Sequence, residues 1–76
     1  MTEQVMEILK ELHPDVDFEN QENLIDDGIL DSMDIVRLVT ELTDRFDVKI
    51  KARDIIPANF NSAKAICALV ERISEE

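Results

Sequence analysis

The chain has 76 residues, 45% of them hydrophobic, with one glycine, two prolines and neither tryptophan nor tyrosine. This length and composition predict one small domain over residues 1–76, whose core is built from aliphatic residues and three phenylalanines. The 18 acidic and 8 basic residues give a net charge of −10, which argues against a nucleic-acid partner because phosphates require a basic surface. The acidity favours either transient docking on cationic protein surfaces or simple solubility.

The single cysteine, Cys67, excludes an intramolecular disulfide and fits a reducing compartment. No segment has the pattern of a signal peptide, and no apolar run approaches the length of a membrane span. We therefore expect a cytoplasmic monomer that does not insert into membranes. One histidine and one cysteine, without a glycine-rich loop, give no recognisable catalytic or metal-binding motif, so we expect neither enzyme activity nor a metal site.

The first predicted helix covers residues 2–12. Its apolar residues recur at helical spacing and form one stripe, made of Val5, Ile8, Leu9 and Leu12. The helix should end at His13, because Pro14 disfavours helical geometry in the residue before it. As the only histidine, at a helix end, His13 is expected to be a solvated terminal residue without a catalytic role.

A long acidic loop is predicted for residues 15–31. It contains seven carboxylates and no lysine or arginine: Asp15, Asp17, Glu19, Glu22, Asp26, Asp27 and Asp31. Phe18 and Leu24 are expected to pin the loop against the core. A calcium-binding EF-hand needs glycine at its sixth position and glutamate at its twelfth, and this loop has Asn20 and Asp26 there. We expect loose screening by cations rather than a specific calcium site.

The second predicted helix covers residues 32–46, and either Asp31 or Ser32 is placed to cap it. Asp34 lies in the first turn, where the helix dipole favours a carboxylate. The Ser32 hydroxyl would be exposed beside free backbone N–H groups, so a phosphodiester built on it would occupy an anion-binding position. From local chemistry alone, Ser32 has two interpretations, an attachment point or only a helix cap.

The last third of the chain predicts one short helix and one long one. Residues 52–56 can form the short helix, which Pro57 would stop. Asn61 or Ser62 would cap the long helix, whose apolar stripe is Ile66, Leu69, Val70 and Ile73. The expected fold is all-α, a small four-helix bundle with three main helices, one short helix and a long first loop. Cys67 is expected to be a small packing residue.

The central sequence resembles the attachment motif and second helix of acyl carrier proteins. The resemblance rests on Leu30-Asp31-Ser32-Met33-Asp34-Ile35-Val36 and the apolar residues that follow it, and length, acidity and loop extend it over nearly the whole chain. It implies that Ser32 carries phosphopantetheine through a phosphodiester, with Asp31, Met33 and Asp34 as the surrounding motif. The thiol of that arm would hold acyl intermediates as thioesters in fatty-acid, polyketide or related biosynthesis, within lipid metabolism.

The resemblance also implies partners and contact residues. A phosphopantetheinyl transferase would attach the arm from coenzyme A, a ligase would load an acyl or aminoacyl group, and acyltransferase or synthase enzymes would accept it. The residues implied for partner binding are Met33, Arg37, Glu41 and Ile50. The residues implied to line an acyl cleft are Val36, Val39, Leu42, Phe46 and Ala58, with the four from the second helix pointing inward.

Two alternatives stay open. The Gly28-Ile29-Leu30-Asp31-Ser32 spacing is similar to that of discrete carriers that serve adenylate-forming ligases, including D-alanyl carriers, so the cargo could be D-alanyl or another aminoacyl group. Arg37 and Arg45 also stand on a helix face that is more uniformly acidic in fatty-acid carriers. Outside the carrier class, the chain could be a small acidic helical module for protein interaction, with Ser32 as a cap.

Overall fold

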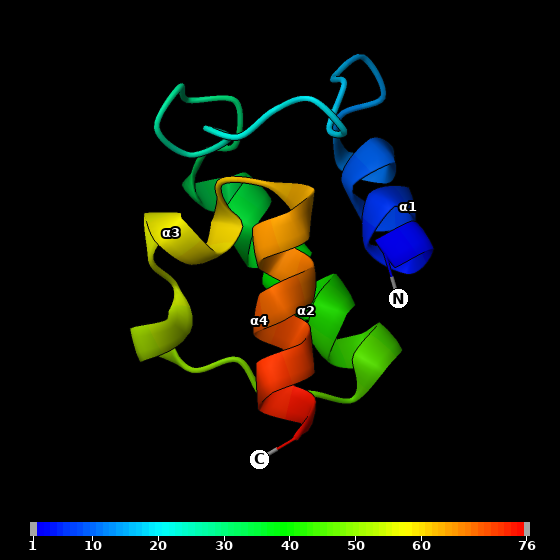
Figure 1. The fold of residues 1–76 in the computed structure, drawn as a ribbon, viewed down its shortest axis with the longest axis vertical. Coiled ribbons are helices and arrows are strands. Elements are labelled where there is room, and N and C mark those ends of the chain that lie inside the picture. Colours follow the sequence, from blue (N-terminus) through cyan, green and yellow to red (C-terminus); the bar gives the residue numbers. More distant parts are fainter. Residues whose placement is uncertain (1, 76) are drawn as a thin grey trace.

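The computed structural model describes residues 2–75 and is helical, with no strand among those residues. Its elements are α1 (Thr2–Leu12), α2 (Ser32–Phe46), a 3₁₀ turn (Ala52–Asp54), α3 (Pro57–Phe60) and α4 (Ala63–Ser74) (Figure 1). The predicted all-α fold, with three main helices and one short helix, is confirmed. No helix of the described chain is both long and apolar enough to cross a membrane.

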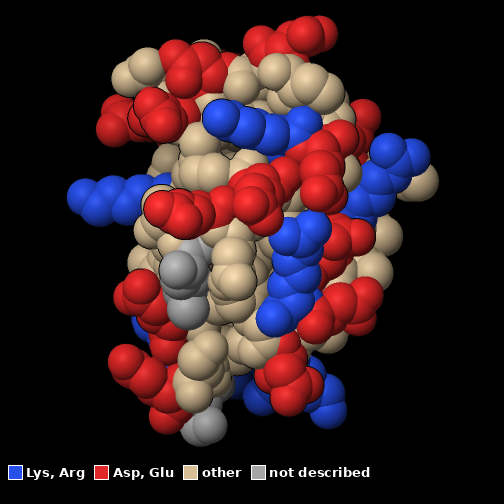
Figure 2. All heavy atoms as spheres, turned by 90° about the vertical axis from the view of Figure 1, so that its right-hand side faces the viewer, with Lys and Arg blue, Asp and Glu red and all other residues tan. Residues whose placement is uncertain are grey.

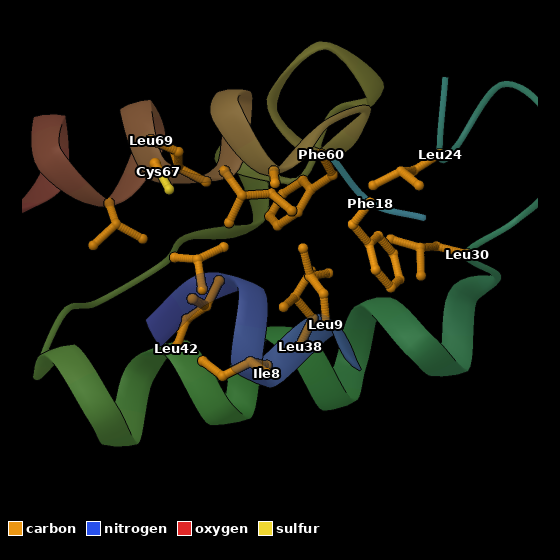
Figure 3. Close-up of a cluster of buried hydrophobic side chains, with 14 of the residues drawn as sticks. Ile8, Leu9, Phe18, Leu24, Leu30, Leu38, Leu42, Phe60, Cys67 and Leu69 are labelled. Atoms are coloured by element: carbon orange, nitrogen blue, oxygen red, sulfur yellow. The ribbon is translucent and has the colours of Figure 1, made fainter. Parts of the chain in front are cut away.

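The core forms where α1 packs against both α2 and α4, and where α3 packs against α4. Each helix contributes an apolar stripe, which in α1 consists of the buried Val5, Ile8 and Leu9. Leu42 of α2 and Leu69 of α4 belong to the same buried cluster (Figure 3). Full burial of one such side chain contributes about 1.5–3 kcal/mol relative to exposure, so these stripes largely set how the helices pack.

The long loop crosses one end of the bundle between α1 and α2 (Figure 1). Phe18, Leu24 and Leu30 are buried and gather at one end of the core cluster (Figure 3), which confirms the two predicted anchors. The loop is also bound to the segment between α3 and α4. The Leu24 N–H donates to the Asn61 carbonyl and the Ile25 N–H to Asn61 Oδ1, both at 2.9 Å.

The short helix lies elsewhere than predicted. Residues 52–54 form only a 3₁₀ turn, and Pro57 begins α3 instead of stopping a helix. Proline suits the first position of a helix, because its fixed φ is helical and the N–H it lacks would have had no intrahelical partner there. Of the two residues predicted to cap the last helix, Asn61 and Ser62, the cap is Ser62. Its Oγ accepts a hydrogen bond from the Ala65 N–H at 3.0 Å.

Cys67 is buried in the face that α4 turns toward the core, as expected for a packing residue. Its Sγ donates to the Thr2 hydroxyl oxygen at 3.8 Å, which joins the beginning of α1 to the middle of α4.

Candidate functional site at the start of α2

Asp31 caps α2, so Ser32 is the first residue inside the helix. The Asp31 Oδ1 accepts from the Asp34 N–H at 2.9 Å, and Asp34 Oδ2 accepts from the Asp31 N–H at 3.2 Å. These reciprocal bonds form a capping box, in which Asp31 occupies the position that Ser32 would need to act as the cap. The interpretation of Ser32 as a helix cap is therefore wrong.

Ser32 is exposed, and the end of the long loop leads into α2 at one end of the bundle (Figure 1). The N–H groups of Ser32 and Met33 lie in the first turn, where a helix provides no backbone acceptor for them. A phosphodiester on Ser32 Oγ fits this position, because the N–H groups and the positive end of the helix dipole favour an anion.

Asp34 is the one charged residue that is buried in the described part of the chain, with 9% of its surface exposed. Its Oδ2 lies 2.7 Å from Nε2 of His13. Burial alone would raise the pKa of Asp34, but the hydrogen bonds from His13 and from the Asp31 backbone outweigh it and hold that pKa below its ordinary value. The carboxylate is therefore ionised near neutral pH, and His13 Nε2 donates to it, since a carboxylate can only accept.

The prediction that His13 is a solvated terminal residue is wrong. About a third of its side chain is exposed, and its imidazole contacts the first turn of α2. No pattern in the sequence indicates this contact, because its two residues are 21 positions apart and meet only through the packing of α1 against α2.

The outer face of α2 displays two apolar side chains near Ser32. Met33 is 63% exposed and Val36 is 60% exposed. The prediction that Val36 points inward is therefore wrong. The inward face of α2 is centred on Leu38 and Leu42, and Val36 lies on the opposite side of the helix.

The other residues assigned to an acyl cleft lie at different depths. Leu42 is fully buried, Val39 and Phe46 are partly buried against the core, and Ala58 is exposed on α3. Ile50, assigned to partner binding, is also only partly buried. The role of these residues in sheltering an acyl chain stays a prediction, now without Val36.

A groove of about 250 Å³ lies between α1 and α2 beside this outer face. Val36, Arg37 and Glu41 line it from α2, and Ile8 and Leu12 line it from α1. Among the described residues, no ion pair includes Arg37, which is exposed. The guanidinium of Arg37 is thus free to meet a partner.

Arg45 neutralises several of the acidic residues on this side of the molecule. Its guanidinium lies 3.3 Å from carboxylate oxygens of Glu7 and of Glu11, and 3.5 Å from that of Glu41. On the side of the molecule that carries α1, basic side chains lie among more numerous acidic ones (Figure 2). The i,i+4 spacing of Glu41 and Arg45 predicts their pairing from the sequence. The pairs of Arg45 with residues of α1 could not be predicted in this way.

Outside this site, the structure adds little chemistry. Lys49, Lys51 and Arg53, the basic cluster after α2, are exposed. Within residues 2–75, no three histidine, cysteine, aspartate or glutamate side chains are grouped so that they could hold a metal ion.

Comparisons with known proteins show the family to which the chain is similar. A family model described as a phosphopantetheine attachment site matches residues 2–70, a span that includes Ser32. The chain is 38% identical over 73 residues to D-alanyl carrier proteins of Streptococcus sanguinis, Streptococcus gordonii and Streptococcus thermophilus. Each alignment covers 95% of this chain and 89% of the relative.

Proposed function

The chain belongs to the family of proteins with a phosphopantetheine attachment site, and we propose that Ser32 is its attachment residue and that its cargo is an aminoacyl group. As a member of that family it is a phosphopantetheine-bearing carrier and not an enzyme. The observation that carries the assignment to Ser32 is the capping box, because Asp31 caps α2 and leaves the exposed Ser32 hydroxyl without a structural task.

The attachment reaction places few demands on this chain. Ser32 Oγ attacks the phosphorus of coenzyme A that bears the pantetheine, a P–O bond forms, and the phosphoanhydride bond breaks to release adenosine 3′,5′-bisphosphate. A base of the phosphopantetheinyl transferase takes the hydroxyl proton. This chain contributes an exposed nucleophile on a rigid helix and backbone N–H groups near the new phosphodiester. The thiol at the end of the arm supplies the thioester chemistry.

The similarity to D-alanyl carrier proteins supports an aminoacyl cargo, with D-alanine as the first candidate. The unpaired Arg37 on the outer face of α2 fits the same choice, because it differs from the acidic face expected of fatty-acid carriers. Loading then requires a cytoplasmic ligase that activates the amino acid as an adenylate. The alternative of a carrier for fatty-acid or polyketide synthesis stays a prediction that these relatives do not support.

Intact mass spectrometry tests the attachment site. The purified chain is incubated with a phosphopantetheinyl transferase and coenzyme A, and it should gain the mass of one arm. Ser32→Ala should gain none, whereas Ser74→Ala, a matched change at an exposed serine near the end of α4, should be modified normally. Modification of Ser32→Ala would refute the site. Loss of modification in both variants would show that the fold, not the nucleophile, was affected.

The cargo is tested with the modified protein. It is offered to a D-alanine-activating ligase with ATP and D-alanine and, separately, to an acyl ligase with ATP and a fatty acid. The aminoacyl proposal expects a mass gain with D-alanine that hydroxylamine removes, as it removes a thioester. Loading by the fatty-acid ligase alone would instead support the alternative.

A further inference from the structure

We propose that His13 is a positioning residue for the attachment serine, because it fixes the first turn of α2 to the end of α1. This inference rests on the proposed role of Ser32. The contact that carries it is the 2.7 Å hydrogen bond from His13 Nε2 to the buried carboxylate of Asp34.

His13 is itself held firmly. It follows the last residue of α1, and its N–H still donates to the Leu9 carbonyl at 3.0 Å. Its carbonyl accepts from the Val16 N–H at 3.2 Å, where the long loop begins. Because its backbone is held on both sides, the His13 side chain starts from a fixed point at the end of α1.

The Asp34 carboxylate transmits this constraint to Ser32. The same oxygen, Oδ2, accepts from both His13 Nε2 and the Asp31 N–H. Asp31 in turn accepts from the Asp34 N–H and, through its carbonyl, from the Ile35 N–H at 3.0 Å. Ser32 lies inside this closed set of hydrogen bonds, so the direction of its hydroxyl depends on the position of the Asp34 carboxylate.

Loss of the His13 donor would leave a buried carboxylate with one backbone partner. Such a group is costly, and it would be drawn further toward water and away from the capping box. The first turn would then spend part of its time open. A transferase that binds only the ordered turn would find fewer molecules in that conformation. Its apparent affinity for the chain would fall in proportion to the ordered fraction.

Two substitutions at the same position separate hydrogen bonding from other effects. The Nε2 amide of glutamine reaches about as far as His13 Nε2, so His13→Gln should keep the bond. The Nδ2 amide of asparagine is one methylene closer to the backbone, so His13→Asn should lose the bond while the residue stays polar. The control is Ile66→Val in the core of α4, which lowers overall stability away from the site.

The experiment has two readouts. Amide hydrogen exchange on the unmodified protein follows the Asp34 and Ile35 N–H groups, with α4 amides as internal reference. Steady-state kinetics with a phosphopantetheinyl transferase gives KM and kcat for each variant. For His13→Asn we expect faster exchange at these two amides and a KM raised about three- to tenfold with kcat unchanged. His13→Gln should behave as the unmutated protein in both readouts. Ile66→Val should leave KM unchanged and should not speed exchange at the Asp34 and Ile35 amides relative to the α4 amides.

Three results would overturn the inference: His13→Asn with unchanged exchange and KM, His13→Gln as defective as His13→Asn, or Ile66→Val raising KM equally. The last would show that general stability, not positioning, sets recognition. If the unmutated chain is not modified at Ser32 at all, the proposed function fails, but the exchange data still decide whether His13 orders the first turn.

Discussion

The side chain of Asn61 both accepts from and donates to Asp26. Its Oδ1 lies 3.2 Å from the Asp26 N–H, and its Nδ2 lies 3.2 Å from Asp26 Oδ2. The same Oδ1 accepts from the Ile25 N–H, so one amide holds the middle of the long loop against the beginning of α4. The loop is therefore fixed by polar contacts as well as by its buried apolar residues.

Asn61→Ala should lower the free energy of unfolding by about 0.5–1.5 kcal/mol, because it removes the acceptor of two backbone N–H groups, one part-buried and one exposed. Urea denaturation measures the change. Asn23→Ala, at an exposed asparagine in the same loop, is the matched control and should stay within about 0.5 kcal/mol. Equal effects of the two substitutions would mean that the Asn61 contacts do not stabilise the loop.

Because Asp31 caps α2 and Ser32 does not, substitutions at these two adjacent residues should change the stability of the fold unequally. Asp31→Ala should cost about 0.5–2 kcal/mol, because it removes the side chain that caps the helix. Ser32→Ala should change stability by less than about 0.5 kcal/mol, since the exposed Ser32 has no capping bond to lose. Thermal or urea unfolding of both variants checks this, and a larger loss for Ser32→Ala would contradict the assignment of the cap.

Asp34 predicts a loss of stability in acid. The pKa of Asp34 in the folded state lies below its ordinary value of 3.8. As the pH falls below 3.8, the carboxylate is therefore protonated more readily in the unfolded chain than in the folded one. The stabilisation is therefore complete above the ordinary pKa and disappears as the pH falls through the folded-state pKa. Asp34→Asn cannot titrate at this position. The difference in unfolding free energy between the native chain and Asp34→Asn should shrink as the pH is lowered below about 4. A constant difference would show that the Asp34 charge does not contribute.

The net charge predicts that salt stabilises the fold. With a charge of −10 and no basic residue between Asp15 and Asp31, the loop carboxylates repel one another, and salt screens this repulsion over roughly 10 Å at 0.1 M. Sodium chloride and divalent cations should therefore raise the melting temperature. If a monovalent salt has no effect at low to moderate concentration, repulsion in the loop does not limit stability.

The residues whose role is local were predictable from the sequence. Phe18 and Leu24 were predicted to anchor the loop because they are isolated apolar residues in an acidic segment, and their exposure to water would be unfavourable. The motif around Ser32 predicted it as the attachment residue, and that role stays a proposal. Pro57 was assigned the wrong role, because proline can either begin or end a helix, and the choice depends on how α3 packs on α4.

The residues whose role depends on packing could not be predicted. His13 needs the end of α1 to lie beside the first turn of α2, and no pattern within either segment encodes that. Val36 stands in a run where Ile35, Leu38 and Val39 are also apolar, so helical periodicity alone does not say which edge of the stripe faces solvent. The structure decides this by placing Leu38 and Leu42 in the core.

Arg37 predicts how the carrier selects its partners. It is exposed and lines the same groove as Val36, five residues along α2 from Ser32. Among the described residues, Arg37 forms no ion pair with Glu41, which lies instead 3.5 Å from Arg45. A free cation beside exposed apolar residues fits a ligase surface that is acidic or neutral at that point, and it repels enzymes that hold acidic carriers through basic patches.

Arg37→Glu should therefore slow loading by the cognate ligase, mainly through the association rate, and improve recognition by fatty-acid synthase enzymes. Loading kinetics with both enzyme sets, repeated at increasing salt, measure the effect, which should weaken as salt screens the charges. Lys64→Glu, on the exposed side of α4, makes the same change in net charge away from Ser32 and serves as the control. Unchanged rates for Arg37→Glu with both sets, or an equal effect of Lys64→Glu, would show that Arg37 does not select the partner and that only total charge matters.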